Sequence, residues 1–150
     1  MPDVTTEDRL ALRAQLIEHE GVRLKPYRDS VGLLTIGVGR CLDRVGISHE
    51  EAIVLLDHDI AAALGGVTAA FPWFADLDGI RQIVLVDMAF NLGIGGLKKF
   101  TQTLAAVEAG DFSAASDRML NSRWAKQVGG RARRLAQMMA TGKRAPIKET

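Results

Sequence analysis

Two carboxylates and one hydroxyl lie close together in the run HEGVRLKPYRDSVGLLTIGVG, which covers residues 19–39. They belong to Glu20, Asp29 and Thr35. Such a set can carry out hydrolysis, because one carboxyl group can donate a proton while the second carboxylate and the hydroxyl stabilise charge or hold water. The spacing therefore indicates a hydrolase site built on carboxylates.

Helical phase distinguishes Glu20 from its acidic neighbour. Leu12, Leu16 and Glu20 recur every four residues, so Glu20 continues the apolar face of the predicted helix. Glu18 lies about 160° around the helix from Glu20 and points outward. Gly21 is typical of the residue that ends a helix, so we expect Glu20 in the last turn.

A carboxyl group in the last turn lies beside unpaired carbonyls and the negative end of the helix dipole. If Glu20 is also partly withdrawn from water, it should resist ionisation, as a general acid near neutral pH must. The structural alternative is a helix-end acid that pairs with a nearby Arg. The spacing of the residues alone does not decide whether Glu20 is a general acid or the partner of an Arg.

After Gly21 the pattern changes to that of a β-hairpin. Residues 22–26 alternate apolar and basic, residues 29–32 have turn chemistry, and residues 33–39 predict a returning strand. The hairpin should bring Asp29 and Thr35 towards the end of the helix. An Asp that enters a turn is more often a local cap than a catalyst. The glycines at 37 and 39 do not form a dinucleotide loop, because Leu42 stands at the third glycine position.

The rest of the chain predicts helices. Ser48 and Glu51 form a capping-box pattern before an amphipathic helix to about residue 64, which Gly65-Gly66 or Phe71-Pro72 would interrupt. A strongly apolar stretch, Ile80 to Asn91, predicts a buried central helix whose core includes Ile83 and Phe90. Glycines separate the later predicted helices, which are Phe100–Ala109, Phe112–Leu120 and Gly130–Ala140.

Composition suits one compact domain. The 150 residues are 47% hydrophobic, which is enough for a core without disulfides, and Cys41 is the only cysteine. No stretch suggests the roughly 20 apolar residues of a membrane span. His19, His49 and His58 are too dispersed to predict a metal site, so we expect neither metal nor cofactor. Trp73 and Trp124 should pack in the core rather than line a binding site.

Charge is unevenly distributed along the chain. The net charge is +1, but residues 118–150 hold nine Lys or Arg and one acid, which leaves residues 1–117 at −7. A basic segment suggests nucleic-acid binding, through Arg131, Arg133, Arg134, Lys143 and Arg144. No zinc-finger spacing, aromatic stacking pattern or recognition helix supports that hypothesis, and a basic face suits an anionic bacterial surface equally well.

The run around Glu20 resembles the phage-type lysozymes of glycoside hydrolase family 24. Their catalytic pattern is Glu, eight residues, Asp or Cys, five residues and Thr, and this chain matches it with Glu20, Asp29 and Thr35. Later motifs occur in the family's order: Phe90-Asn91-Leu92-Gly93, Gly96 to Thr101, and Ser122-Arg123-Trp124 followed by Arg131 and Arg134. The resemblance covers residues from about 8 to about 142.

The resemblance implies an α+β, predominantly α-helical, lysozyme-like fold in which residues 1–150 form one catalytic domain. A small β-hairpin lobe at about 22–47 and a long connecting helix at about 48–64 would precede a larger helical lobe at about 65–142. The helical lobe would pack with the N-terminal helix, and a cleft would lie between the two lobes. By the family alignment, Arg131 and Asn91 should contribute to substrate binding.

The resemblance also implies a function. The enzyme would be a lysozyme, or N-acetylmuramidase, that cleaves the β-1,4 bond between N-acetylmuramic acid and N-acetylglucosamine in peptidoglycan, with inversion. Glu20 would be the acid, Asp29 the ionised stabiliser, and Thr35 would help hold the water. The alternatives are a lytic transglycosylase on a related fold and a non-catalytic wall-binding domain.

Partners and location follow from the same resemblance. The partner would be bacterial peptidoglycan, bound by a monomer, with no nucleic acid and no membrane span. The polar, acidic residues 1–8 resemble neither a signal peptide nor a signal anchor. We therefore expect synthesis in the host cytoplasm and delivery to the wall through a holin-type pore or in a phage particle.

Two departures from the family pattern concern the edge of the site. Arg40 stands where the typical member has a His, and Asp59 is the expected acid for an ion pair without the pH sensitivity of a His. The segment from Cys41 to Ser48 is also shorter than in the typical member. Both departures should alter the rim of the cleft.

Overall fold

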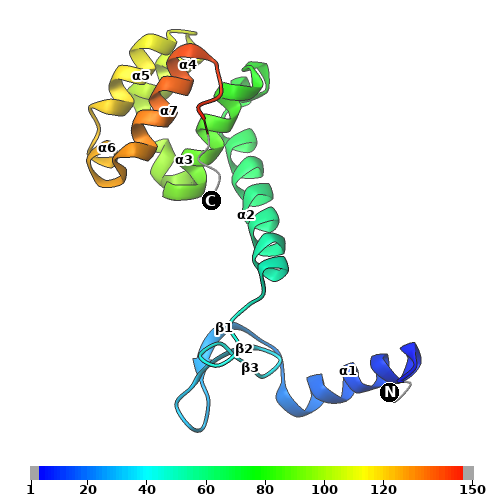
Figure 1. Ribbon diagram of the computed structural model, residues 1–150. Coiled ribbons are helices and arrows are strands. Elements are labelled where there is room, and N and C mark those ends of the chain that lie inside the picture. Colours follow the sequence, from blue (N-terminus) through cyan, green and yellow to red (C-terminus); the bar gives the residue numbers. More distant parts are fainter. Residues whose placement is uncertain (1–3, 147–150) are drawn as a thin grey trace. The chain divides into compact units, whose positions relative to one another are not determined.

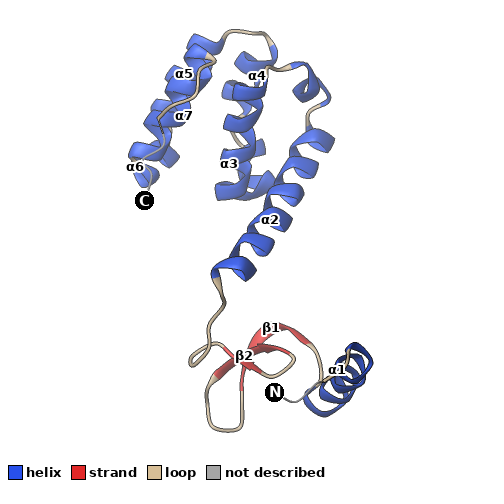
Figure 2. Cartoon of the chain, turned by 45° about the vertical axis from the view of Figure 1, so that its right-hand side comes forward, coloured by secondary structure: helices blue, strands red, loops and turns tan. Residues whose placement is uncertain are grey.

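The computed structural model describes residues 4–146. The chain forms two compact units, Met1–Val54 and Leu55–Thr150. The boundary falls inside a single long helix, α2 (His49–Ala70). Helices dominate both views of the chain, and one small antiparallel sheet accompanies them, as the predicted α+β class requires (Figures 1 and 2).

The first unit begins with helix α1 (Thr6–Glu20). Thr5 caps it through a reciprocal pair of hydrogen bonds with Asp8, a capping box. The helix ends as the sequence predicts, because Gly21 adopts a φ of 72° and its N–H donates to the carbonyl of Ile17 at 2.8 Å. Glu20 therefore occupies the last helical position.

Three short strands form the sheet of the first unit, in the order β1 (Arg23–Arg28), β2 (Leu34–Gly37) and β3 (Arg40–Cys41). All neighbours are antiparallel, with Tyr27 opposite Thr35 and Thr35 opposite Cys41. The hairpin prediction is confirmed for β1 and the turn at 29–32. The predicted strand 33–39 ends earlier, at Gly37, and a tight turn leads into β3.

Helix α2 extends further than the sequence suggests. The predicted capping box is present, because the Ser48 N–H donates to Glu51 Oε2 at 2.7 Å and the Glu51 N–H donates to Ser48 Oγ at 3.1 Å. The helix does not stop at residue 64 or at Gly65-Gly66 but continues to Ala70. Val67 is fully buried just beyond the two glycines, and the roughly 1.5–3 kcal/mol from burying its side chain offsets the roughly 2 kcal/mol that two glycines cost inside a helix.

The second unit packs its remaining helices around one core. These elements are η1 (Pro72–Asp76), α3 (Gly79–Lys98), α4 (Thr101–Glu108), α5 (Phe112–Leu120), α6 (Arg123–Val128) and α7 (Gly130–Thr141). Helix α5 packs against α4 and α7, while α3 and α6 also pack against α7 (Figure 1). The short elements η1 and α6 were not predicted, because five or six residues are too few to show a helical period.

Helix α3 supplies the centre of this core. Val84, Leu85 and Met88 are completely buried, so the predicted central helix is confirmed. Its core assignment is wrong for Ile83 and Phe90, which are each 44% exposed. These two residues are seven positions apart and therefore share a face of α3 that points away from the buried residues. The helix is kinked at Gly93, where φ is 73°.

Two helices of the described chain, α2 and α3, reach the length and apolar composition of a membrane span. The expectation that no stretch comes near a span is therefore too strong. Helix α3 buries five of its residues in the core, and packing accounts for its apolar character. Helix α2 carries Asp57 and Asp59 near its middle, and an Asp at the centre of a span costs about 2.5–3.5 kcal/mol.

Candidate active site

Glu20 is positioned by the end of α1 and by a glycine of the β2–β3 turn. A β-carbon added to Gly39 would lie 2.7 Å from Glu20 Oε2 and 2.9 Å from Glu20 Cδ, so the carboxylate rests on the backbone of this residue. Glu20 is exposed, and with Leu16 and Val38 it lines a hollow of about 590 Å³ in the first unit. A substrate group can therefore reach its carboxyl oxygens.

Asp29 opens the turn between β1 and β2 and caps it. Its Oδ1 accepts hydrogen bonds from the N–H groups of Val31 at 3.0 Å and Leu33 at 2.9 Å. The local-cap interpretation is therefore correct for one oxygen. Within residues 4–146 no hydrogen bond is made by the other oxygen, Oδ2, and Asp29 is only half-buried. The cap thus fixes the carboxylate and leaves one oxygen available.

Thr35 lies in the middle of β2 and is only 3% exposed. Its hydroxyl donates to the carbonyl of Leu33 at 3.0 Å. The same carbonyl accepts from the Asp29 N–H at 2.9 Å, and the Leu33 N–H binds the Asp29 carboxylate. The backbone of Leu33 therefore couples the positions of Asp29 and Thr35.

Arg40 has a different partner from the one expected. Its guanidinium forms a two-pronged ion pair with Glu51, at 2.6 Å from NH2 to Oε1 and 2.7 Å from NH1 to Oε2. The expected Arg40–Asp59 pair is therefore wrong. Glu51 lies in the first turn of α2, where its carboxylate already accepts from the Ser48 N–H, so it can receive the guanidinium as well.

The ion pair closes the short 41–48 segment. Arg40 NH1 also donates to the carbonyl of Gly46 at 3.2 Å, and the Leu34 N–H donates to Asp43 Oδ2 at 2.7 Å. The hydrogen bond from the Ser48 backbone N–H, followed by that from Arg40, holds the pKa of the Glu51 carboxyl below its usual value. The segment is thus fixed at both ends by side chains.

The two predicted substrate-binding residues lie in the second unit, and each has a partner there. Asn91 Oδ1 accepts from the indole N–H of Trp124 at 2.8 Å. Arg131 binds Asp87, at 2.8 Å from Nε and 2.7 Å from NH2 to Oδ1. Trp124 is only 4% exposed, so its predicted packing role is confirmed. In the first unit, the backbone of Leu33 links Asp29 and Thr35, and Glu20 lies against Gly39 in the turn after β2.

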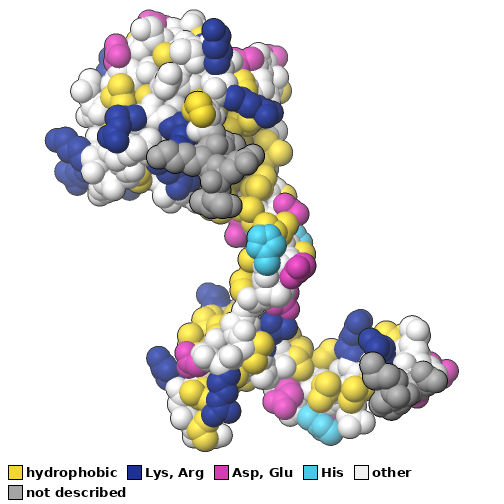
Figure 3. Space-filling view, in the orientation of Figure 1, with side chains coloured by type: hydrophobic (Ala, Val, Ile, Leu, Met, Phe, Trp, Pro, Cys, Tyr) yellow, Lys and Arg dark blue, Asp and Glu magenta, His cyan; other side chains and the backbone are white. Residues whose placement is uncertain are grey.

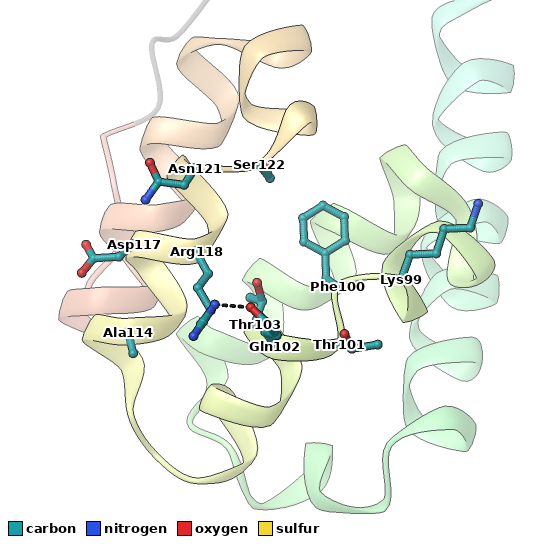
Figure 4. Close-up of a pocket in the computed structure, with 10 residues that line it drawn as sticks. All are labelled: Lys99, Phe100, Thr101, Gln102, Thr103, Ala114, Asp117, Arg118, Asn121 and Ser122. Atoms are coloured by element: carbon teal, nitrogen blue, oxygen red, sulfur yellow. Dashed lines mark hydrogen bonds between the residues drawn. The ribbon is translucent and has the colours of Figure 1, made fainter.

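A hollow of about 680 Å³ lies on the second unit and was not predicted (Figure 4). Lys99 to Thr103 line one side, and residues of α5 and the turn after it line the other. Arg118 donates to Gln102 across it, as the dashed line shows (Figure 4). Two stretches that are about ten residues apart in the sequence form this hollow, and the polar run Thr101 to Thr103 is its only signal in the sequence.

Within residues 4–146, no three His, Cys, Asp or Glu side chains lie close enough together to hold a metal ion. In the first unit, Glu20 and Asp29 supply two carboxyl groups and Thr35 supplies a hydroxyl. One carboxyl group is free at a helix end, and the other is fixed by backbone N–H groups with an oxygen to spare. Proton donation combined with charge stabilisation fits this set.

A helix that ends in an acid, an Asp-capped hairpin and a helical second unit define the class of lysozyme-like α+β proteins. Comparison with known families agrees. The family described as phage lysozyme matches residues 17–141, and the chain belongs to it. The chain is accordingly a lysozyme-type glycosidase, a hydrolase of the cell wall.

Several relatives are similar along most of the chain. The pre-baseplate central spike protein Gp5 of Enterobacteria phage T4 is 30% identical over 172 residues, which cover 95% of this chain but 30% of that protein. The SAR-endolysin of Escherichia phage Mu is 31% identical over 120 residues, 78% of this chain and 67% of the endolysin. Probable T4-type lysozyme 1 of Dictyostelium discoideum is 23% identical over 161 residues, which cover 88% of this chain and 95% of that protein.

Proposed function

We propose that the enzyme is a muramidase that cleaves the β-1,4 bond between N-acetylmuramic acid and N-acetylglucosamine. The observation that carries this proposal is the first unit's arrangement of Glu20, Asp29 and Thr35 in the family's spacing. Glu20 ends a helix with its carboxylate seated on Gly39, and Asp29 keeps one free oxygen. Membership of the phage lysozyme family supports the choice of substrate.

Each residue has a distinct role in the proposed reaction. Glu20 donates a proton to the leaving glycosidic oxygen, and Asp29 stabilises positive charge on the sugar and orients the attacking water through Oδ2. The Thr35 hydroxyl has donated its only proton to Leu33, so it can contribute only as an acceptor from that water. No step requires a metal or a cofactor.

The proposed stereochemical outcome is inversion. Inverting glycosidases leave room for a water molecule between two carboxyl groups that are about 6.5–9.5 Å apart, whereas retaining enzymes hold them at about 5–5.5 Å. Proton NMR of the first product formed from a soluble glycan fragment would show the α-anomer if the enzyme inverts. An initial β-anomer would indicate retention and remove this part of the proposal.

Asn91 and Arg131 remain proposed substrate-binding residues. Both are polar and partly accessible, and the Arg131–Asp87 pair borders a hollow of about 520 Å³ with apolar walls from α2 and α3. A guanidinium fixed by one carboxylate retains other N–H donors for a sugar or a peptide carboxylate.

We propose that the enzyme acts as a monomer.

The proposed biological role is lysis of the bacterial wall by a phage-encoded enzyme. One relative is named an endolysin and another a baseplate spike protein, so release during lysis and delivery in a particle both have precedent. Synthesis in the host cytoplasm suits either route. Immunodetection in purified particles and in lysing cells would distinguish the two.

Analysis of products tests the reaction against its alternatives. Digestion of purified peptidoglycan should release muropeptides with reducing-end muramic acid. A lytic transglycosylase would instead release 1,6-anhydromuramic acid, and that product would overturn the proposal. A non-catalytic wall-binding domain would bind saturably and release nothing.

Glu20→Gln tests the role of the acid. The substitution removes the transferable proton while keeping the side chain's size, so wall hydrolysis should fall by roughly 100-fold or more. The melting temperature should stay close to that of the wild type, because Glu20 is exposed. Glu18→Gln is the matched control and should retain full activity. Normal turnover by Glu20→Gln would exclude Glu20 as the acid.

A further inference from the structure

The second unit carries a cationic surface at the end where α6 meets α7. We define this cationic surface as the exposed side chains of Arg123, Lys126, Arg133 and Arg134. Figure 3 shows Lys and Arg side chains gathered at the end of the helical unit that carries α6 in Figure 1. No acid occurs between residues 118 and 146 to offset this charge.

The packing of α7 turns these charges outward. Ala132, Leu135, Ala136 and Met139 on its inner face are at most 2% exposed, which leaves Arg133 and Arg134 on the outer face. Helix α6 packs against α7 and adds Arg123 and Lys126. The core of the second unit therefore determines where the cationic surface lies.

Within residues 4–146, the four cations have no side-chain partner. The ion pairs of the described residues involve only Arg40, Arg81 and Arg131, and no side-chain hydrogen bond within residues 4–146 comes from the cationic surface. Arg131 shows the contrast, because it lies in the same segment but is bound by Asp87. The charges of the cationic surface are thus available to an external anion.

We propose that the cationic surface binds the free carboxylates of peptidoglycan stem peptides, away from the bond that is cleaved. This inference rests on the proposed function, which makes peptidoglycan the substrate. Its stem peptides present repeated carboxylates along an extended polymer, so several cations can bind at once. The contact would hold the enzyme near its substrate and raise its rate of encounter with the wall.

The test is binding of the full chain to purified sacculi that lack phosphate polymers, measured by co-sedimentation at increasing salt. A protein carrying Glu20→Gln is compared with the same protein that also carries Arg123→Gln, Lys126→Gln, Arg133→Gln and Arg134→Gln. The cationic-surface variant should bind at least about tenfold more weakly at low salt, and its affinity should depend less on salt.

The matched control removes four exposed cations elsewhere on the same unit, by Lys98→Gln, Lys99→Gln, Lys143→Gln and Arg144→Gln. It has the same net charge as the cationic-surface variant and should bind several-fold more tightly. Equal loss in both variants would show an effect of net charge alone and overturn the proposal. Melting of the cationic-surface variant well below the parent protein would also overturn it, because the four residues would then be structural.

Chemical blocking identifies the ligand. Sacculi whose carboxylates are amidated with a carbodiimide should bind the parent protein as weakly as the cationic-surface variant. Undiminished binding to the amidated sacculi would exclude carboxylates as the ligand. If the parent protein binds phosphatidylglycerol vesicles more strongly than sacculi, and the cationic-surface variant loses that binding, the surface binds a membrane instead. Soluble muropeptides in the same tubes report separately on cleavage, so the proposed function and this inference can fail independently.

Discussion

The carboxylate of Glu20 lies directly against the α-carbon of Gly39, where an added β-carbon would come within 2.7 Å of Oε2. Gly39 also adopts a φ of 65°, a conformation that disfavours side chains. Gly39 therefore sets the position of the carboxyl group that we propose as the acid. This contact joins a residue at the end of α1 to the turn after β2.

Gly39→Ala should reduce wall hydrolysis by about 100-fold, because a displacement of roughly 1 Å at a reacting group has this effect. Its stability should fall by about 1–2 kcal/mol from the backbone conformation. Gly37→Ala is the matched control, since Gly37 has a φ of 69° and no atom within 4 Å of an added β-carbon. If both variants lose the same activity, backbone strain rather than contact with Glu20 is responsible.

Asp29→Asn and Asp29→Ala separate the two roles of Asp29. The Asn side chain can still accept from the Val31 and Leu33 N–H groups, so its unfolding free energy should change by no more than about 0.5 kcal/mol. Its activity should fall by roughly 100-fold or more. The Ala variant should lose the same activity and also about 1–2 kcal/mol of stability. An active Asn variant would restrict Asp29 to the turn.

The stabilisation of the folded protein by the Glu51 carboxylate should depend on pH. Hydrogen bonds from the Ser48 N–H and from Arg40 lower its pKa from the ordinary value of 4.5 in the folded state. The stabilisation is therefore present above about pH 4.5 and is lost as the pH falls through the lowered, folded-state pKa. Glu51→Gln should melt below the wild type at pH 7, and the difference should shrink as the pH falls below 4.5 and through the lowered, folded-state pKa of Glu51.

The control for Glu51 is Glu50→Gln, which makes the same charge change one residue away at the start of α2. It should show a smaller difference at pH 7, because no hydrogen bond to the Glu50 side chain occurs within residues 4–146. A Glu51→Gln difference in melting temperature that does not shrink as the pH falls below 4.5 would contradict the linkage argument.

Arg131→Ala tests whether this residue binds substrate or only Asp87. The ion pair is more than one-third exposed on both sides, so its loss should cost no more than about 1 kcal/mol of stability. Loss of a charged contact with substrate should raise KM by roughly tenfold or more. Asp87→Asn breaks the same ion pair and keeps the cation, and it should leave KM nearly unchanged. Equal effects of the two substitutions on KM would reduce Arg131 to a structural role.

The sequence alone determined the local features of the first unit. The end of α1 at Gly21, the Asp29 turn and the Ser48–Glu51 capping box all depend on residues that are at most four positions apart. Hydrogen bonds over such separations follow from residue type and backbone preference, with little help from the rest of the chain. The central helix around Met88 was also predictable, because apolar residues that recur with the period of a helix indicate a buried face.

Only the tertiary structure decided the contacts between distant residues. The partner of Arg40 is Glu51 rather than Asp59, Asn91 meets Trp124, and Arg131 meets Asp87. Each depends on how one packed element faces another, which residue spacing does not encode. The same holds for α2, where the burial of Val67 carries the helix past two glycines that local propensity would make its end. Residue types thus defined which groups could react, and packing defined what each of them touches.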